Sequence, residues 1–303
     1  MSLLFLKLKN TSSLRMKKIQ VGFLLSYDYE KLKYAIPPVY READTIFIAM
    51  DHKNRTWSGE KFEVEPDFFN WLKEFDVDNK IVIYKDDFYD SSLLAIENDN
   101  RERHMLSLKM GIGNWLIQID SDEYVLDFKK FVSDLRKYDS YLDNPKENNI
   151  QIAMYSLNLY KYVDNGILFV KTPTKAVVAT NYPNYKVARV TRERIVYTQN
   201  LLLHESIARD EEELIFKLDN WGHNIEIQDK EAFLYKWRTT NKSNYKEREN
   251  FFYIEPEKWK HLEFCEGNSI EEIRKNINLE GIMPSKFFIA KKNFGQYFKH
   301  LFK

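Results

Sequence analysis

Residues 115–123 read WLIQIDSDE, an apolar run that ends in three acidic residues around one serine. The run from Trp115 to Ile119 has the length and composition of a buried β-strand. Asp120 and Asp122 follow it directly, and alternate residues of an extended segment point to the same side. The sequence therefore predicts two neighbouring carboxylates at the carboxyl end of a strand.

The first half of the chain repeats this pattern three more times. Strands are predicted at residues 19–25, 45–50 and 80–84, and helices at residues 29–42, 66–75 and 98–110. This alternation predicts an α/β fold, with a mostly parallel sheet flanked by helices. Polar clusters follow these strands as well: Ser26-Tyr27-Asp28, Asp51-His52 and Asp86-Asp87. Because parallel strands end at one edge of a sheet, we expect all four clusters to meet at one site.

The second half has a different pattern. A helix is predicted at residues 128–138, and longer strands at 150–160, 167–171, 175–179 and 195–203, which favours a mixed or antiparallel extension of the sheet. Asp210 is predicted to cap a helix that ends at Gly222, which places His223 just beyond the helix. We expect residues 1–16 to be a leader or disordered segment, residues 17–240 one domain with halves 17–125 and 126–240, and residues 241–303 a helical extension.

Composition excludes several classes of protein. Lys and Arg together number 46, as do Asp and Glu, so no long-range field would gather nucleic acid. The single cysteine, Cys265, cannot close an intrachain disulfide, and a disulfide-free chain is typical of a reducing compartment. The only apolar run near the start, residues 3–6, is far shorter than the roughly 20 residues of a membrane span. We expect a cytoplasmic protein.

The carboxylate pair suggests a divalent cation. Two carboxylates held together repel each other unless a positive charge lies between them, and hard oxygen ligands suit Mg²⁺ or Mn²⁺. Such an ion would take up charge that grows on a departing diphosphate. The alternative is that Asp120 and Asp122 are solvated or cap a helix, as acidic pairs in loops often are.

The same residues resemble the family 2 glycosyltransferases. NRER at residues 100–103, a helix, GNWLI at 113–117 and QIDSDE at 118–123 look like the Arg-containing helix and the strand ending in Asp-x-Asp of that family. LHE at 203–205 and NWGH at 220–223 look like later elements of its bacterial surface-glycan members. The resemblance covers about residues 17–240 and implies a GT-A fold, a Rossmann-like sheet with a mixed extension and a helical C-terminal tail.

The resemblance also implies an activity. The chain would transfer a hexose from a nucleoside-diphosphate sugar, most plausibly a UDP-sugar, to a hydroxyl of a surface polysaccharide or lipid-linked glycan. Asp122 would bind Mn²⁺ or Mg²⁺ directly, and Asp120 would contact the ribose or the metal through water. The nucleoside and diphosphate would be held by a larger set: Tyr27, Asp51, Asp87, Arg101 and Arg103.

Three residues of the second half complete the implied site. His223 and His204 compete for a place as metal ligand, and His204 is alternatively a contact of the acceptor. Glu205 would be the general base of an inverting reaction, because a partly buried carboxylate can reach a pKa suited to taking a proton from the acceptor. The alternatives are that each histidine makes one structural hydrogen bond, and that Glu205 is paired with Arg209 or Arg189.

The sequence departs from the family in two places and leaves two rivals. Residues 51–54 lack the usual paired acidic residues, and the Gln-x-x-Arg-Trp element of processive synthases is absent, which favours single sugar addition. One rival is a non-catalytic protein that binds glycan or nucleotide on the same fold. The other is a sugar nucleotidyltransferase, which the lack of a Gly-rich phosphate loop after the first strand disfavours.

The tail of the chain mixes aromatic and basic residues. Residues 286–303 contain five lysines among phenylalanines and a tyrosine. Such a segment is typical either of a helix packed on its own domain or of a peripheral contact with the anionic inner face of a membrane.

Overall fold

The computed structural model describes residues 17–227, 229–252 and 256–301. The expected leader at residues 1–16 lies outside this range. The described strands are β1 (Ile19–Leu25), β2 (Thr45–Asp51), β3 (Ile81–Asp86), β4 (Trp115–Ile119), β5 (Glu123–Val125), β6 (Ile150–Val163), β7 (Gly166–Val170), β8 (Thr174–Thr180), β9 (Arg194–His204) and β10 (Leu262–Glu266). The main helices are α1 (Leu32–Ala35), α2 (Pro37–Tyr40), α3 (Pro66–Phe75), α4 (Ala95–Met110), α5 (Phe128–Arg136), α6 (Glu211–Asn220), α7 (Lys230–Thr239), α8 (Ile270–Asn276) and α9 (Lys286–Leu301).

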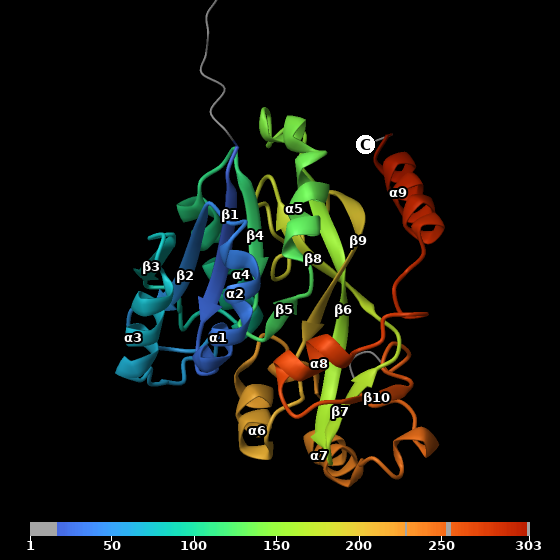
Figure 1. Cartoon of the computed structure of the whole chain (residues 1–303). Coiled ribbons are helices and arrows are strands. Elements are labelled where there is room, and N and C mark those ends of the chain that lie inside the picture. The colour runs from blue at the N-terminus through green and yellow to red at the C-terminus, as the bar shows by residue number, and fades with distance from the viewer. Residues whose placement is uncertain (1–16, 228, 253–255, 302–303) are drawn as a thin grey trace, which may run out of the picture.

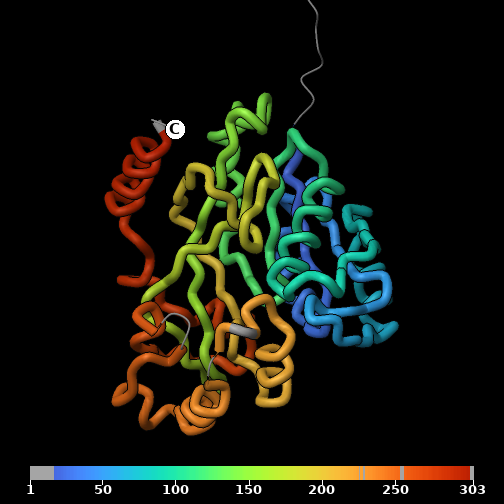
Figure 2. The backbone as a smooth tube through the Cα atoms, turned by 180° about the vertical axis from the view of Figure 1, so that it is seen from behind, coloured from blue at the N-terminus to red at the C-terminus, as the bar shows by residue number. Residues whose placement is uncertain are grey.

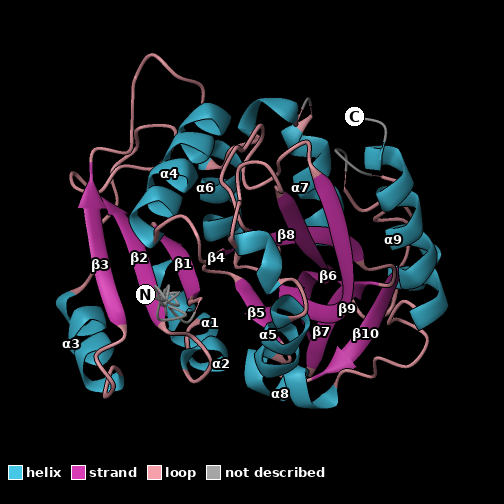
Figure 3. Ribbon diagram, turned by 90° about the horizontal axis from the view of Figure 1, so that it is seen from above, coloured by secondary structure: helices cyan, strands magenta, loops and turns pink. Residues whose placement is uncertain are grey.

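The described strands form one sheet, and helices lie on both of its faces (Figures 1 and 3). The order is β10-β7-β6-β8-β4-β1-β2-β3, with β9 pairing with both β5 and β6. The chain therefore has an α/β fold with a large mixed sheet flanked by helices, an arrangement compatible with a Rossmann-like fold.

The first four strands form a parallel half with a change of direction. β1 pairs in parallel with β2 and β4, and β2 pairs in parallel with β3. The chain moves from β1 outward to β3 and then returns to the other side of β1 for β4. In open α/β sheets, ligands bind beyond the carboxyl ends of the strands at such a switch point. The predicted parallel strands are confirmed, and they place a crevice between the ends of β1 and β4.

The other half of the sheet is mixed, as the longer strands predict. β8 is antiparallel to β4 and β6, whereas β9 is parallel to β6. The short strand β5 was not predicted, and it pairs with the end of β9, Glu123 opposite His204. This pairing fixes the turn that carries Asp122 beside the second half of the chain.

Helix α4 brings basic residues to the crevice. It packs across β1, where Gly22 leaves room: a Cβ there would lie 2.8 Å from Leu106 Cδ2. The helix begins at Ala95 rather than at the predicted Asn98, because the carboxylate of Glu97 in its first turn accepts a hydrogen bond from the Leu94 N–H at 2.8 Å. The predicted helix 29–42 is divided, since Pro37 occupies the first turn of α2 and begins a new helix.

The C-terminal extension is not wholly helical, so this expectation is wrong in one respect. β10 pairs antiparallel with β7 and adds an outer strand to the sheet, with Leu262 and Cys265 buried in different core clusters. A second core also crosses residue 240: Phe251, Phe252 and Trp259 pack with Leu214 and Trp237. Figure 2 shows α9, in red, at the side of the molecule, where it is hydrogen-bonded to β9.

None of the helices that the structure describes is long and apolar enough to cross a membrane.

Candidate functional site

A cavity of about 440 Å³ opens at the switch point. Its wall combines Tyr27 and Asp28 after β1 with residues 120–123 after β4, and adds His204 from β9 and Lys217 from α6. The prediction that all four polar clusters meet at one site is therefore confirmed for the first and fourth, and wrong for Asp51-His52 and Asp86-Asp87, which are absent from this lining. Segments far apart in the sequence supply this lining, so the cavity depends on both halves of the sheet.

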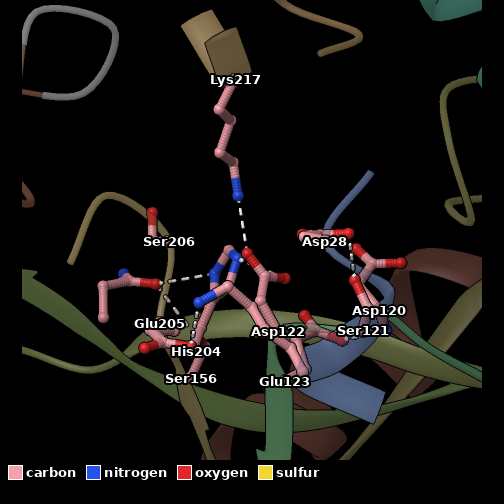
Figure 4. Close-up of polar contacts among 12 residues, drawn as sticks. Asp28, Asp120, Ser121, Asp122, Glu123, Ser156, His204, Glu205, Ser206 and Lys217 are labelled. Carbon is pink, nitrogen blue, oxygen red and sulfur yellow. Dashed lines mark hydrogen bonds and ion pairs between the residues drawn. The ribbon is translucent and has the colours of Figure 1, made fainter. Parts of the chain in front are cut away.

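Asp122 lies at the centre of this wall and is almost fully buried. Its Oδ2 accepts hydrogen bonds from Lys217 Nζ and from an Arg209 guanidinium nitrogen, both at 2.6 Å, and its Oδ1 lies 3.5 Å from His204 Nε2. Figure 4 shows Lys217 reaching down to Asp122 from α6. Burial alone would raise the pKa of Asp122, but Lys217, His204 and Arg209 outweigh it and hold the pKa well below its usual value.

The contact with Asp122 holds Lys217 in a buried position. Desolvation and the neighbouring Arg209 lower the pKa of Lys217, and Asp122 opposes them. The Lys217 side chain is only 10 % exposed and lines the cavity. A buried cation that faces a cavity is a preorganised partner for an anionic ligand, because no water has to be displaced from it during the reaction.

Asp120 faces the same cavity but is more open. Its Oδ1 accepts a hydrogen bond from Arg103 at 2.8 Å, and Arg189 lies 3.7 Å away. Burial works to raise the pKa of Asp120, yet Arg103 and Arg189 bring it below its usual value. Arg103 is also bonded to Asp99, one turn earlier on α4, so its guanidinium is fixed in place.

Two further ion pairs hold the turn itself. Arg189 makes a two-pronged pair with Glu123, at 2.7 and 2.5 Å. Ser121 donates to Asp28 at 2.8 Å, and Asp28 also accepts from Arg209 at 3.0 Å. Each of these carboxylates therefore already has a cationic partner in the described structure.

The unpaired buried atoms in the cavity wall are donors. Among the described residues, one guanidinium nitrogen of Arg103 and the indole Nε1 of Trp221 are buried without a hydrogen-bond partner. A buried donor left unpaired costs free energy that an acceptor would recover. The wall is thus chemically suited to a ligand rich in acceptor oxygens, such as a phosphate or a sugar.

Of the two predicted histidines, only His204 touches the acidic pair. Both line the cavity, but His223 Nδ1 bonds to Glu226 at 2.6 Å on the exposed side of its turn. The other nitrogen of His204 lies 3.2 Å from Asn158 Oδ1.

Glu205 follows His204, which lines the cavity, but Glu205 itself is not part of the lining. Its Oε2 accepts from Lys31 at 2.8 Å and from Tyr124 at 2.6 Å, and its Oε1 accepts from Tyr162 at 3.3 Å. This is the paired arrangement that the sequence left open, with Lys31 in place of Arg209 or Arg189. Burial of Tyr124 and Tyr162, and second to it the neighbouring Glu205 carboxylate, raise the pKa of both tyrosines.

The remaining predicted residues form a separate cluster beyond β2 and β3. Arg55 bonds both oxygens of Asp51 at 2.9 Å and also contacts Asp87. Arg101 donates to the backbone carbonyls of Asp87 and Phe88. Asp51, Asp87 and Arg101 therefore lie outside the cavity lining, whereas Tyr27 and Arg103 belong to it.

Cationic side chains already bond the two carboxylates at which the sequence predicts a divalent cation. Among the described residues, the only group of three or more acidic, histidine or cysteine side chains gathered closely enough to share an ion is Asp51, His52 and Asp87. There Arg55 already occupies the space between the carboxylates. At Asp122, an ammonium and a guanidinium both bond Oδ2, and their positive charges would repel a cation at that oxygen.

Sequence reasoning missed Lys217, although a signal was present. Leu214, Lys217, Leu218 and Trp221 share the spacing of one helix face, so the lysine stands among core positions. The sequence predicts Arg209 and Arg189 only as partners of Glu205, because nothing local indicates which carboxylate an arginine of a loop will reach.

Compared with models of known protein families and with curated proteins, the chain matches none.

Proposed function

We propose that this protein is a glycosyltransferase of GT-A architecture. It transfers the sugar of a nucleoside-diphosphate sugar to a hydroxyl of a glycan or lipid-linked acceptor. UDP-sugars are the first donors to test. The observation that carries the proposal is the position of Asp120 and Asp122 in a cavity at the sheet's switch point, opposite the buried cation of Lys217.

The size and lining of the cavity support this substrate class. Its volume of about 440 Å³ falls in the range of small-molecule sites. Trp57 and Trp221 line it together with Tyr27, and aromatic faces stack on bases and on the apolar faces of sugars. Arg103, Trp221 and Lys217 supply nitrogen donors to the lining, which supports a ligand with acceptor oxygens such as a diphosphate.

These residues would act on the reaction by stabilising charge. Cleavage of the bond between sugar and diphosphate leaves negative charge on the departing oxygen, and fixed donors lower the barrier by meeting that charge. Lys217 and Arg103 can meet it as they stand, while Asp120 can accept from a ribose hydroxyl. Inversion at the anomeric carbon is the expected outcome of direct displacement. Glu205, predicted as its base, lies outside the cavity lining and is bonded to Lys31 and two tyrosines, so it would have to be released from them to act.

Titration calorimetry of UDP and GDP tests the site. We expect one nucleotide to bind the parent, and Lys217→Met to weaken it by about tenfold or more, since a charge-assisted contact is lost. Lys129→Met, an exposed lysine of α5, is the matched control and should bind as the parent does. Failure of both nucleotides to bind would favour the non-catalytic glycan-binding alternative.

The same titration decides the question of the metal. The divalent cation expected from the sequence stays a prediction, and it requires binding to need Mn²⁺ or Mg²⁺ and to disappear with a chelator. If the protein's own cations suffice, affinity will be unchanged by the chelator. A product with retained anomeric configuration would remove Glu205 as base.

A further inference from the structure

Helix α9 exposes a group of aromatic side chains. Phe287 is 79 % exposed and Phe294 is 66 % exposed, and Phe288, Tyr297 and Phe298 are each between 42 and 50 % exposed. Phe287, Phe294 and Phe298 follow the spacing of a single helix face. Contiguous apolar surface of this kind marks a site of interaction rather than ordinary scatter.

Polar side chains hold the opposite face of α9 against the sheet. Asn293 accepts from the backbone N–H of Tyr197 at 2.7 Å and donates to its carbonyl at 2.9 Å. Gln296 accepts from the N–H of Ile195 at 3.2 Å. Ile289 is the buried apolar residue on this side. The helix is therefore docked by its polar face, and its aromatic face is turned outward.

The outward face is also basic. Residues 286–301 contain four lysines and no acidic residue. Lys291 lies between Phe287 and Phe294 on the same stripe, and Lys292 Nζ stands 5.4 Å from the Phe288 ring centre. Lysines among aromatic rings are complementary to a surface that is apolar beneath and anionic above.

We propose that α9 binds the protein to an anionic lipid bilayer, with its phenylalanine rings at the boundary of headgroups and acyl chains and its lysines on lipid phosphates. The inference goes beyond the proposed transfer reaction and does not rest on it. The mixture of aromatic and cationic residues favours lipid over a second copy of this chain, because a second copy would oppose lysine with lysine.

Vesicle sedimentation tests the proposal. The full chain is mixed with vesicles of phosphatidylcholine alone or with added phosphatidylglycerol. We expect binding to the anionic vesicles that weakens as salt is raised, because charged lipid attraction is screened. The triple variant Phe287→Ser/Phe294→Ser/Phe298→Ser should lower the bound fraction by about tenfold or more. Tyr235→Ser, which removes an aromatic side chain 68 % exposed on α7, should leave it unchanged.

Charge reversal and size separate lipid binding from self-association. Lys291→Glu/Lys292→Glu should abolish the preference for phosphatidylglycerol while the chain stays folded by circular dichroism. Equal binding to both vesicle types, or binding to neither, would overturn the proposal. A parent that is dimeric by light scattering and becomes monomeric in the triple variant would also overturn it, and would assign the aromatic face to a second copy.

Discussion

Asp122 and Lys217 depend on each other, since each is a buried charge whose main partner is the other. Asp122→Asn leaves Lys217 and Arg209 facing a neutral group. We expect the free energy of unfolding to fall by about 3 kcal/mol, as for other buried pairs that lose one partner. Adding Lys217→Met should recover part of this loss, because the stranded ammonium is removed. Urea unfolding of both variants measures it, and equal stability of parent and single variant would contradict the pairing.

Glu102 gives the protein a pH dependence. Burial raises its pKa to about 7, against a hydrogen bond from Trp57 Nε1 that lowers it. The folded state holds this proton more tightly than the unfolded state, so stability falls as pH rises from about 4.5 to 7, by about 3 kcal/mol for this group. Glu102→Gln keeps an acceptor for Trp57 and should flatten this fall in unfolding curves at pH 5 and 7.5. Glu63→Gln, at an exposed site, should not.

For single residues, the sequence predicted the positions that depend only on neighbouring residues in the chain. Asp120 and Asp122 follow an apolar strand directly, so their place at the sheet edge could be inferred from spacing alone. The partners of Glu205 could not, because Lys31 lies 174 residues away along the chain. Which side of β9 faces the cavity is decided by its pairing with β5, and that pairing has no local signal.

Asn293 is the residue on which the position of α9 depends. Asn293→Ala removes both hydrogen bonds to the backbone of Tyr197, each worth about 1 kcal/mol net. We expect local opening rather than global unfolding, so hydrogen exchange at the Tyr197 amide should accelerate by about tenfold. Lys291→Ala on the exposed face of the same helix serves as control. Unchanged exchange at Tyr197 in the Asn293 variant would show that other contacts hold the helix.

Elements with a strong local pattern were predicted well. β1, α3 and the Asp210 cap of α6, which accepts from the Glu213 amide at 2.8 Å, follow directly from periodicity and capping residues. β5 and β10 were missed because β5 has only three residues, and β10, LEFCE, mixes two glutamates with its apolar residues. They are strands only because β9 and β7 offer them a partner.

The second core makes the last sixty residues part of the fold. A chain ending at residue 240 lacks Phe251, Phe252 and Trp259, which pack with residues of α6 and α7. We expect this fragment to lose cooperative thermal unfolding, since each buried aromatic side chain contributes a few kcal/mol. A chain ending at residue 285 keeps the cluster and should unfold cooperatively. A cooperative transition in the shorter fragment would instead support an independent domain at residues 17–240.

Helix α9 has one more consequence for the whole molecule. The outer side of β9 near Tyr197 meets side-chain amides of α9 instead of a neighbouring strand in the described structure. A strand edge left bare is a template for pairing with other chains, and such pairing leads to aggregation. Asn293 and Gln296 imitate the missing strand, so they protect the protein from polymerising with itself. Release of α9 would therefore lower the solubility of the protein. Attachment to a membrane has to occur with α9 still bonded to β9.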